Sequence, residues 1–460
     1  MGLIKELVLL PWIVVGVIVF VGLLLQKKPI EDVFRGTIKS VIGFEIIIIG
    51  GQLISESVVP FGQMFQYAFH ITGIMLNVEA VTGVVVKEYG VQVSIIMVLG
   101  LIANLILAKI TRYRYVFVTG QHVLYMACMI VCVLNAYHVK GIIAYLDAAL
   151  AMGISMVLMP AILQKYTVRI CGNDMVAMGH FGSSSYLMAA WLGKIYGEDS
   201  RSIEKIRIPK RLSFLRDAAV TVTITMIVMY MVVAYAAGST YIEQHLSNGK
   251  NYMVYALTQA MEFSAGFVVV TTGIRLFISE IVPAVKGFAD RWLPNARAAI
   301  DCPFIFPYAS NALLVGFLFS FLGGLFSMGF MSVCGLTVIL PGIVSHFFCG
   351  ATAGVYGNST GGIRGTCIGG FVNGVYMSFL PLLFLPHIGT MGNASVTFPD
   401  EDFGLVGLML GSWLRRVGPY QTFLILIGIV IIMVLLPEMI ENREEGRPWF
   451  IGEDDIYKDK

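Results

Sequence analysis

Charged residues are scarce in this sequence. Lysine, arginine, aspartate and glutamate make up 13% of its 460 residues, and 57% of the residues are hydrophobic. Ordinary soluble proteins carry about 25% charged residues. The stretches 7–25, 93–108 and 423–436 contain no charged residue at all. A soluble globular domain of this size could not hydrate such a surface, so the composition excludes that class and indicates a membrane protein.

Signatures of several other function classes are missing too. No Gly-rich Walker A loop ending in Lys-Ser or Lys-Thr is found, which excludes an ATPase of that type. The 7 cysteines are scattered without a Cys-x-x-Cys pair, so we expect neither a metal site nor a disulfide framework, and no other cofactor is indicated. The formal net charge is +2, too small to suggest a nucleic acid or another polyanionic partner.

What the sequence does contain is a series of long apolar runs. A helix needs about 20 apolar residues to cross roughly 30 Å of hydrocarbon, because every backbone amide must be bonded internally there. The runs predict an all-α polytopic membrane protein of about eleven transmembrane helices. We expect these spans near residues 7–25, 40–60, 93–109, 115–137, 141–163, 218–238, 256–279, 311–331, 332–349, 366–385 and 419–437.

Cationic loops predict how the chain is oriented. Lysines and arginines concentrate in 194–216 and in the first loop, so both segments should face the cytoplasm. The first run lacks a small-residue cleavage site, and we expect a retained span rather than a secretory signal. The N-terminus then lies outside. We expect residues 1–437 to form one membrane-embedded domain and 438–460 a charged cytoplasmic tail.

Two segments are too polar for lipid-facing helices and too apolar for ordinary loops. They are 171–195, which contains Gly179-His180-Phe181-Gly182, and 294–311, which contains Asp301-Cys302-Pro303. Irregular backbone at membrane depth is tolerated only where protein or a water-filled cavity covers it. We therefore predict two re-entrant hairpins facing the interior. Paired broken segments of this kind indicate a solute site near the midplane of a transporter.

Ionisable residues inside the predicted spans are candidates for function, because a charge in the bilayer costs several kcal/mol unless it is paired or hydrated. Asp301 could accept hydroxyl hydrogen bonds from a sugar or polyol, or it could cap a helix. His180 could bind the same solute, or it could be satisfied by a neighbour. Near 119–125, polar side chains open a span and could bind a solute or join helices. The remaining charged candidates are Glu45, Glu79, Asp147, Glu262, Arg275 and Glu280.

Several blocks together resemble a known family. They are Gly36-Thr37-Ile38-Lys39 with Ile42-Gly43-Phe44, Thr119-Gly120, Gly179-His180, Gly273-Ile274-Arg275-Leu276-Phe277 through Ala299-Ile300-Asp301-Cys302, and Leu340-Pro341-Gly342 with Ala351-Thr352. In order and spacing they are similar to the ascorbate-type EIIC permease of the bacterial phosphotransferase system. The resemblance implies a homodimer in the lipid bilayer, each protomer with interleaved core and dimerisation subdomains. It also implies a small carbohydrate cargo, ascorbate or a related sugar or polyol, phosphorylated by a separate EIIB that EIIA recharges.

The same resemblance implies a set of substrate-binding residues. His180 and Asp301 match the family pattern directly. Gln121 and Tyr125 stand where the family has His and Gln, with His122 adjacent; Phe181 stands for a Gln, and Val78-Glu79 for a Thr-Tyr pair. A second carboxylate from Glu79 and a stacking face from Phe181 suit a neutral sugar or polyol better than the ascorbate anion.

Two other functions fit the intramembrane carboxylates. One is a secondary transporter that couples a proton to solute entry through Asp301, Glu79 or His180. The other is a sensor or orphan permease that has lost transport. A phosphorylated product whose formation depends on EIIB would favour the phosphotransferase permease over both of these alternatives.

Overall fold

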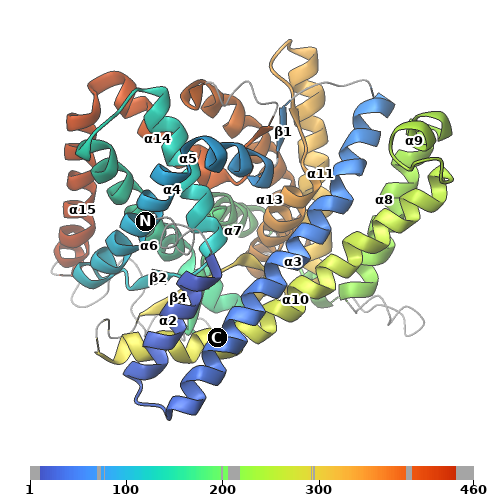
Figure 1. Cartoon of the computed structure of the whole chain (residues 1–460). Coiled ribbons are helices and arrows are strands. Elements are labelled where there is room, and N and C mark those ends of the chain that lie inside the picture. The colour runs from blue at the N-terminus through green and yellow to red at the C-terminus, as the bar shows by residue number, and fades with distance from the viewer. Residues whose placement is uncertain are drawn as a thin grey trace.

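The structure is a computed structural model that describes residues 11–69, 74–76, 78–197, 200–205, 218–291, 293, 296–389 and 396–441. Its helices form two groups (Figure 1). The first group is built from α2 (Pro11–Leu25), α3 (Ile30–Phe69), α8 (Ala218–Ala237), α9 (Ser239–His245) and α10 (Tyr252–Arg291). The second contains α4 (Val78–Ile110), α5 (Gly120–Ala136), α6 (Ile142–Cys171), α7 (Ser183–Tyr196), α11 (Ser310–Val333), α12 (Ile343–Ser345), α13 (Ala351–Phe384), α14 (Glu401–Val417) and α15 (Pro419–Glu441).

The first group is organised by two very long helices. α3 and α10 have 40 residues each and lie side by side along the molecule, with α2 and α8 against them (Figure 1). The hydroxyl of Tyr230 in α8 donates a 2.6 Å hydrogen bond to the carbonyl of Ser57 in α3. A helix of this length extends about 60 Å, roughly twice the hydrocarbon thickness. Both helices must therefore tilt or project beyond the bilayer.

Close helix contacts hold the second group together. α11 packs along α13 where Gly316 and Gly354 face each other, and a side chain on either residue would meet the backbone of the other. Small residues allow membrane helices to approach in this way. α13 is interrupted at Gly361 and Gly362, and Gly362 has a φ of +53°. The helix can bend there because glycine adopts positive φ without a Cβ clash.

Short strands lie between the helices of the second group. Two parallel three-stranded sheets occur in the described chain: β2-β4-β3 and β5-β1-β6. They pair Phe117 with Ala299 and Ala177 with Ala299 in one sheet, and Met75 with Leu340 in the other. The strands are β1 (Ile74–Leu76), β2 (Tyr115–Phe117), β3 (Val176–Met178), β4 (Arg297–Ile300), β5 (Ile339–Leu340) and β6 (Val396–Thr397).

Every one of these strands is followed within a few residues by the start of a helix. From the first sheet the chain enters α5, α7 and the 3-10 helix η3 (Cys302–Tyr308); from the second it enters α4, α12 and α14. Parallel strands end at the same edge of a sheet. The helix N-termini of each sheet are therefore gathered at one edge, with their unpaired backbone amides beside one another.

The expectation of a predominantly helical membrane protein is confirmed, with corrections in detail. Within the described ranges four helical segments are long and apolar enough to cross a bilayer, or five if α8 and α9, bent by 100°, form one span. The count of eleven spans stays a prediction. The expected span 332–349 is wrong: this segment contains β5, α12 and the start of a π-helix, η4 (His346–Gly350). Gly335 at a φ of +65° and Pro341 break the helix that its apolarity suggested.

Both predicted hairpin segments are indeed broken, but each combines a strand with a helix. Residues 171–195 include β3, a turn and most of α7, and the described part of 294–311 includes β4, Asp301 and η3. Gly179 lets β3 approach β4, because a side chain there would strike the carbonyl of Ala299. The space beside Gly179 is thus taken by the neighbouring strand.

Candidate functional site

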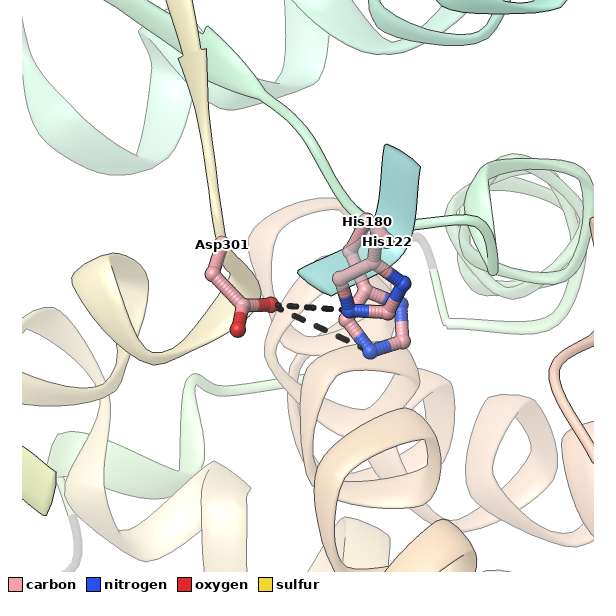
Figure 2. A group of neighbouring side chains, drawn as sticks. All are labelled: His122, His180 and Asp301. Carbon is pink, nitrogen blue, oxygen red and sulfur yellow. Dashed lines mark ion pairs between the residues drawn. The ribbon is translucent and has the colours of Figure 1, made fainter. Parts of the chain in front are cut away.

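Two histidines and an aspartate from three separate segments converge beside the first sheet (Figure 2). His122 lies in the first turn of α5, His180 between β3 and α7, and Asp301 between β4 and η3. The Oδ1 atom of Asp301 lies 3.4 Å from Nε2 of His122 and 4.0 Å from Nε2 of His180. The two imidazole rings are 4.2 Å apart, and both histidines are at most 5% exposed. The strands bring these groups together because their ends share one edge of the sheet.

Asp301 is held by further hydrogen bonds. The side-chain amide of Gln121 donates to Oδ2 over 2.8 Å, and the backbone amide of Cys302 donates to Oδ1 over 2.7 Å. The second bond makes Asp301 the N-cap of η3. The helix-capping interpretation of Asp301 is confirmed, and its role in binding a solute stays a prediction.

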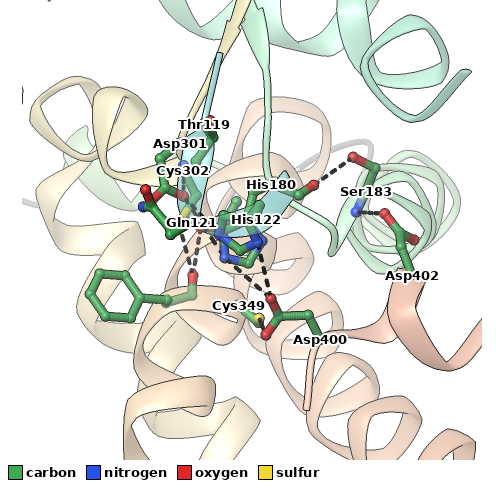
Figure 3. A network of polar contacts seen from close by, with 12 residues as sticks. Thr119, Gln121, His122, His180, Ser183, Asp301, Cys302, Cys349, Asp400 and Asp402 are labelled. Atoms are coloured by element: carbon green, nitrogen blue, oxygen red, sulfur yellow. Dashed lines mark hydrogen bonds and ion pairs between the residues drawn. The ribbon is translucent and has the colours of Figure 1, made fainter. Parts of the chain in front are cut away.

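A fourth segment reaches the same place from the second sheet (Figure 3). Asp400, which follows β6, places Oδ2 3.6 Å from Nδ1 of His122 and 3.9 Å from Nε2 of His180. The thiol of Cys349 in η4 lies 3.6 Å from the other Asp400 oxygen. Asp400 is 5% exposed. The histidines therefore lie between two carboxylates. Asp301 follows a strand of the first sheet, and Asp400 follows a strand of the second.

Asp402 connects the same two segments through the backbone. Its carboxylate accepts hydrogen bonds from the amides of Ser183 and Ser184, over 2.7 and 3.0 Å, at the start of α7. Its own amide donates to the carbonyl of Phe181 over 2.8 Å. A carboxylate at a helix N-terminus is stabilised by the unpaired amides and the positive end of the helix dipole. The turn that carries His180 is thereby fixed against α14.

Behind the histidines lies a buried polar network. The Tyr186 hydroxyl lies 2.9 Å from Nδ1 of His180, which leaves Nε2 facing the carboxylates. Asn373 in α13 donates to the hydroxyl of Ser185 and to the carboxylate of Glu401, and its side-chain oxygen accepts from Ser320. Buried hydrogen bonds of this kind make a core more rigid. Here the network ties α7, α11, α13 and α14 together around the turn of His180.

The aromatic residues of the predicted set lie next to this cluster. Tyr125 is half-buried with its ring 5.8 Å from that of His122. Phe181 is fully buried and stacks on Phe117 at a ring distance of 4.8 Å, with Phe403 at 5.4 Å. Its proposed role as a stacking face for a sugar stays a prediction, because in this state neighbouring rings pack against it.

Val78 and Glu79 open α4, which follows the central strand of the second sheet. The Val78 side chain packs in the same hydrophobic cluster as Phe117 and Phe181. The side chain of Glu79 lies outside the described residues, as does that of Glu280. The structure thus brings Gln121, His122, Tyr125, His180, Phe181 and Asp301 together, and the solute-facing role of the Val78-Glu79 pair stays a prediction.

The cluster also has the chemistry of a metal site. One ligand atom each from His122, His180 and Asp301 lie within 4.8 Å of one another, and the same holds for His180, Cys349 and Asp400. Imidazole, thiolate and carboxylate are the ligands that zinc takes in proteins. The sequence predicts no metal, and that expectation stays a prediction.

The acidic run Asp400-Glu401-Asp402 is not among the residues predicted from the sequence. The predicted charged candidates lie inside apolar spans, whereas this run lies between the expected spans 366–385 and 419–437. A signal was present, because consecutive acids directly before an amphipathic run are typical of a helix start. Cys349, Tyr186 and Asn373 carry no comparable signal in a sequence rich in apolar and small residues.

Discontinuous helices that place polar and ionisable side chains together inside a helical membrane protein are typical of solute transporters. The family described as PTS system sugar-specific permease component, EIIC-GAT, matches residues 7–402, and the chain belongs to it. This confirms the resemblance seen in the sequence. The chain is also similar to the ascorbate-specific PTS system EIIC component of Mycoplasma pneumoniae, with 23% identity over 430 residues. That match covers 80% of this chain and 64% of the relative, so the chain spans just under two thirds of the relative's length.

Proposed function

We propose that this chain is the membrane permease of a phosphotransferase system, which binds a small carbohydrate and carries it to a separate EIIB for phosphorylation. The observation that carries the proposal is the convergence of His122, His180, Asp301 and Asp400 from four broken segments, in a chain of the sugar-permease family. EIIA would recharge EIIB in turn.

The chemistry of the cluster favours a solute with several hydroxyl groups. Ionised carboxylates only accept hydrogen bonds, whereas an imidazole can donate and accept. Hydrogen bonds to a charged group contribute about 1.5–3 kcal/mol each. Asp301 and Asp400 flank the histidines, so an anionic solute would meet two like charges. We therefore propose a neutral sugar or sugar alcohol as cargo in preference to the ascorbate anion.

Transport requires the cluster to open. His122 and His180 are 5% and 4% exposed, and they contact the carboxylates directly, so a solute must replace contacts that the residues make with one another. All four broken segments belong to the second helix group. We propose that this group, as the core subdomain, moves against a scaffold formed by α3 and α10. In this proposal two copies of the scaffold form a homodimer in the inner membrane, with N-termini outside and C-termini in the cytoplasm.

Uptake in cells that express the chain with matched EIIA and EIIB tests the proposal. A panel of labelled neutral sugars, sugar alcohols and ascorbate is offered, and the intracellular product is analysed for phosphate. We expect a phosphorylated neutral carbohydrate whose appearance depends on EIIB. Accumulation of unmodified solute that follows the proton gradient would instead establish secondary transport, and failure to bind any carbohydrate would contradict a permease role.

A further inference from the structure

A cationic hollow lies far along the chain from the histidine cluster, at the turn between α2 and α3. It has a volume of about 350 Å³ and is lined by Leu23, Lys28, Asp32, Arg35 and Lys39. Three of these side chains are cations and one is a carboxylate, so the lining carries a net positive charge. Asp32 forms an ion pair with Arg35, one turn apart on α3, which orients the guanidinium beside the hollow. The chemistry of the lining therefore selects an anion.

The hollow lies where apolar chain changes to charged chain. α2 carries no charged residue and ends at Leu25, and Gln26-Lys27-Lys28-Pro29 leads into α3. In membrane proteins this transition marks the level of the lipid headgroups, where lysine and arginine concentrate. If α2 crosses the bilayer as the sequence predicts, the cations of the hollow lie at the depth of lipid phosphate groups.

Exposed apolar ridges continue from the hollow along both helices, on the side away from the turn. On α3, Ile42, Ile49 and Leu53 follow the cations on the helix face of Arg35 and are 47%, 49% and 36% exposed. On α2, Val17 and Val21 are 57% and 37% exposed. Near the turn, the rings of Phe20 and Phe34 join the two helices, with centroids 5.7 Å apart. An inorganic anion would make no contact with these ridges, whereas acyl chains would pack on them.

We infer that this hollow binds an anionic phospholipid, with the phosphodiester on Lys28, Arg35 and Lys39 and the acyl chains along the ridges of α2 and α3. Basic pockets between membrane helices are known to hold anionic headgroups, and each nearby cation strengthens the interaction. A zwitterionic headgroup brings its own cation to a site that already has three. The inference is independent of the proposed transport function. The lipid would lie against α3, one of the two long helices of the first group.

Native mass spectrometry of the full chain, released from phosphatidylcholine nanodiscs that contain a minority of phosphatidylglycerol, measures which lipid is retained. The variants are Lys28→Gln, Arg35→Gln and Lys39→Gln, singly and together. We expect each to weaken phosphatidylglycerol retention about fivefold and the triple variant on the order of a hundredfold, with phosphatidylcholine retention unchanged. The matched control removes two exposed cations elsewhere, Lys140→Gln with Lys250→Gln, and should retain the lipid.

Three results would overturn the inference. They are full retention by the triple variant, equal loss in the control variant, and displacement of the lipid by inorganic phosphate as readily as by short-chain phosphatidylglycerol, which would make free phosphate the ligand. Charge-preserving Lys28→Arg with Lys39→Arg should keep the lipid, and this separates a binding defect from misfolding. Ile42→Ser should weaken retention without changing the oligomer. Loss of a dimer with normal retention would instead make the ridge a contact between two copies of the chain.

Discussion

Asp402 accepts a 2.7 Å hydrogen bond from the backbone amide of Ser183, a residue 219 positions earlier in the chain. The bond fixes the start of α7 to the start of α14, and the His180 turn lies directly before that bond. The link explains why two strand–helix segments from different sheets keep a common geometry. It also makes Asp402 a positioning residue, since its carboxylate holds backbone amides.

Replacing Asp402 with alanine should destabilise the protein and disorder the turn of His180. The change leaves the amides of Ser183 and Ser184 without their acceptor in a buried site. We expect a loss of about 3 kcal/mol in the free energy of unfolding and weaker solute binding. Thermal unfolding and equilibrium binding measure the two effects, with Asp402→Asn between the wild type and Asp402→Ala. Unchanged stability in the alanine variant would show that water replaces the carboxylate, while Glu88→Gln on the exposed face of α4 serves as the control.

Asp301→Asn should weaken solute binding and uptake far more than Asp147→Asn. Asp301 faces two imidazoles and the amide of Gln121, whereas Asp147 is buried in α6. The loss of one charge-assisted hydrogen bond corresponds to about ten- to a hundredfold in affinity. Binding isotherms of the purified variants give the ratio directly. Equal effects at the two positions would mean that the site is elsewhere.

Asp400→Asn should change the choice of solute. The substitution removes one of the two carboxylates that flank His122 and His180 while preserving the size of the side chain. We expect ascorbate to compete better against a neutral sugar in this variant than in the wild type, because one like charge is gone. Competition uptake with both solutes measures this ratio. A ratio equal to that of the wild type would remove Asp400 from the solute site.

Asp147→Leu should leave the fold at least as stable as the wild type. Both carboxylate oxygens of Asp147 are buried without a hydrogen-bond partner, and the residue is 0% exposed. Burying such a group costs free energy that an apolar side chain of similar volume does not. Thermal unfolding of the two proteins in the same detergent tests the expectation. A lower melting temperature in the variant would reveal that the carboxylate has a stabilising partner, such as a bound cation.

His180 and Asp301 were predictable because ionisable groups stand out in an apolar sequence, and the bilayer makes them costly unless they serve a purpose. The strands were not predictable, since β5 and β6 have 2 residues each, too few to show an alternating pattern. The contact between His122 and Asp400 could not be predicted for the same reason. Each residue follows a short strand, and its position depends on which strands pair in the two sheets. The apolarity of 332–349 predicted a span, but a two-residue strand pairs with β1 there instead.

The β5-β1-β6 sheet has a consequence for biosynthesis. Its central strand is made when the chain has reached residue 76, but one edge strand is not made until residue 397. Asp400 and Asp402 emerge from the ribosome later still. The turn that carries His180 is therefore synthesised long before Asp402, whose hydrogen bonds fix it. We expect the polar cluster to assemble late in folding for this reason.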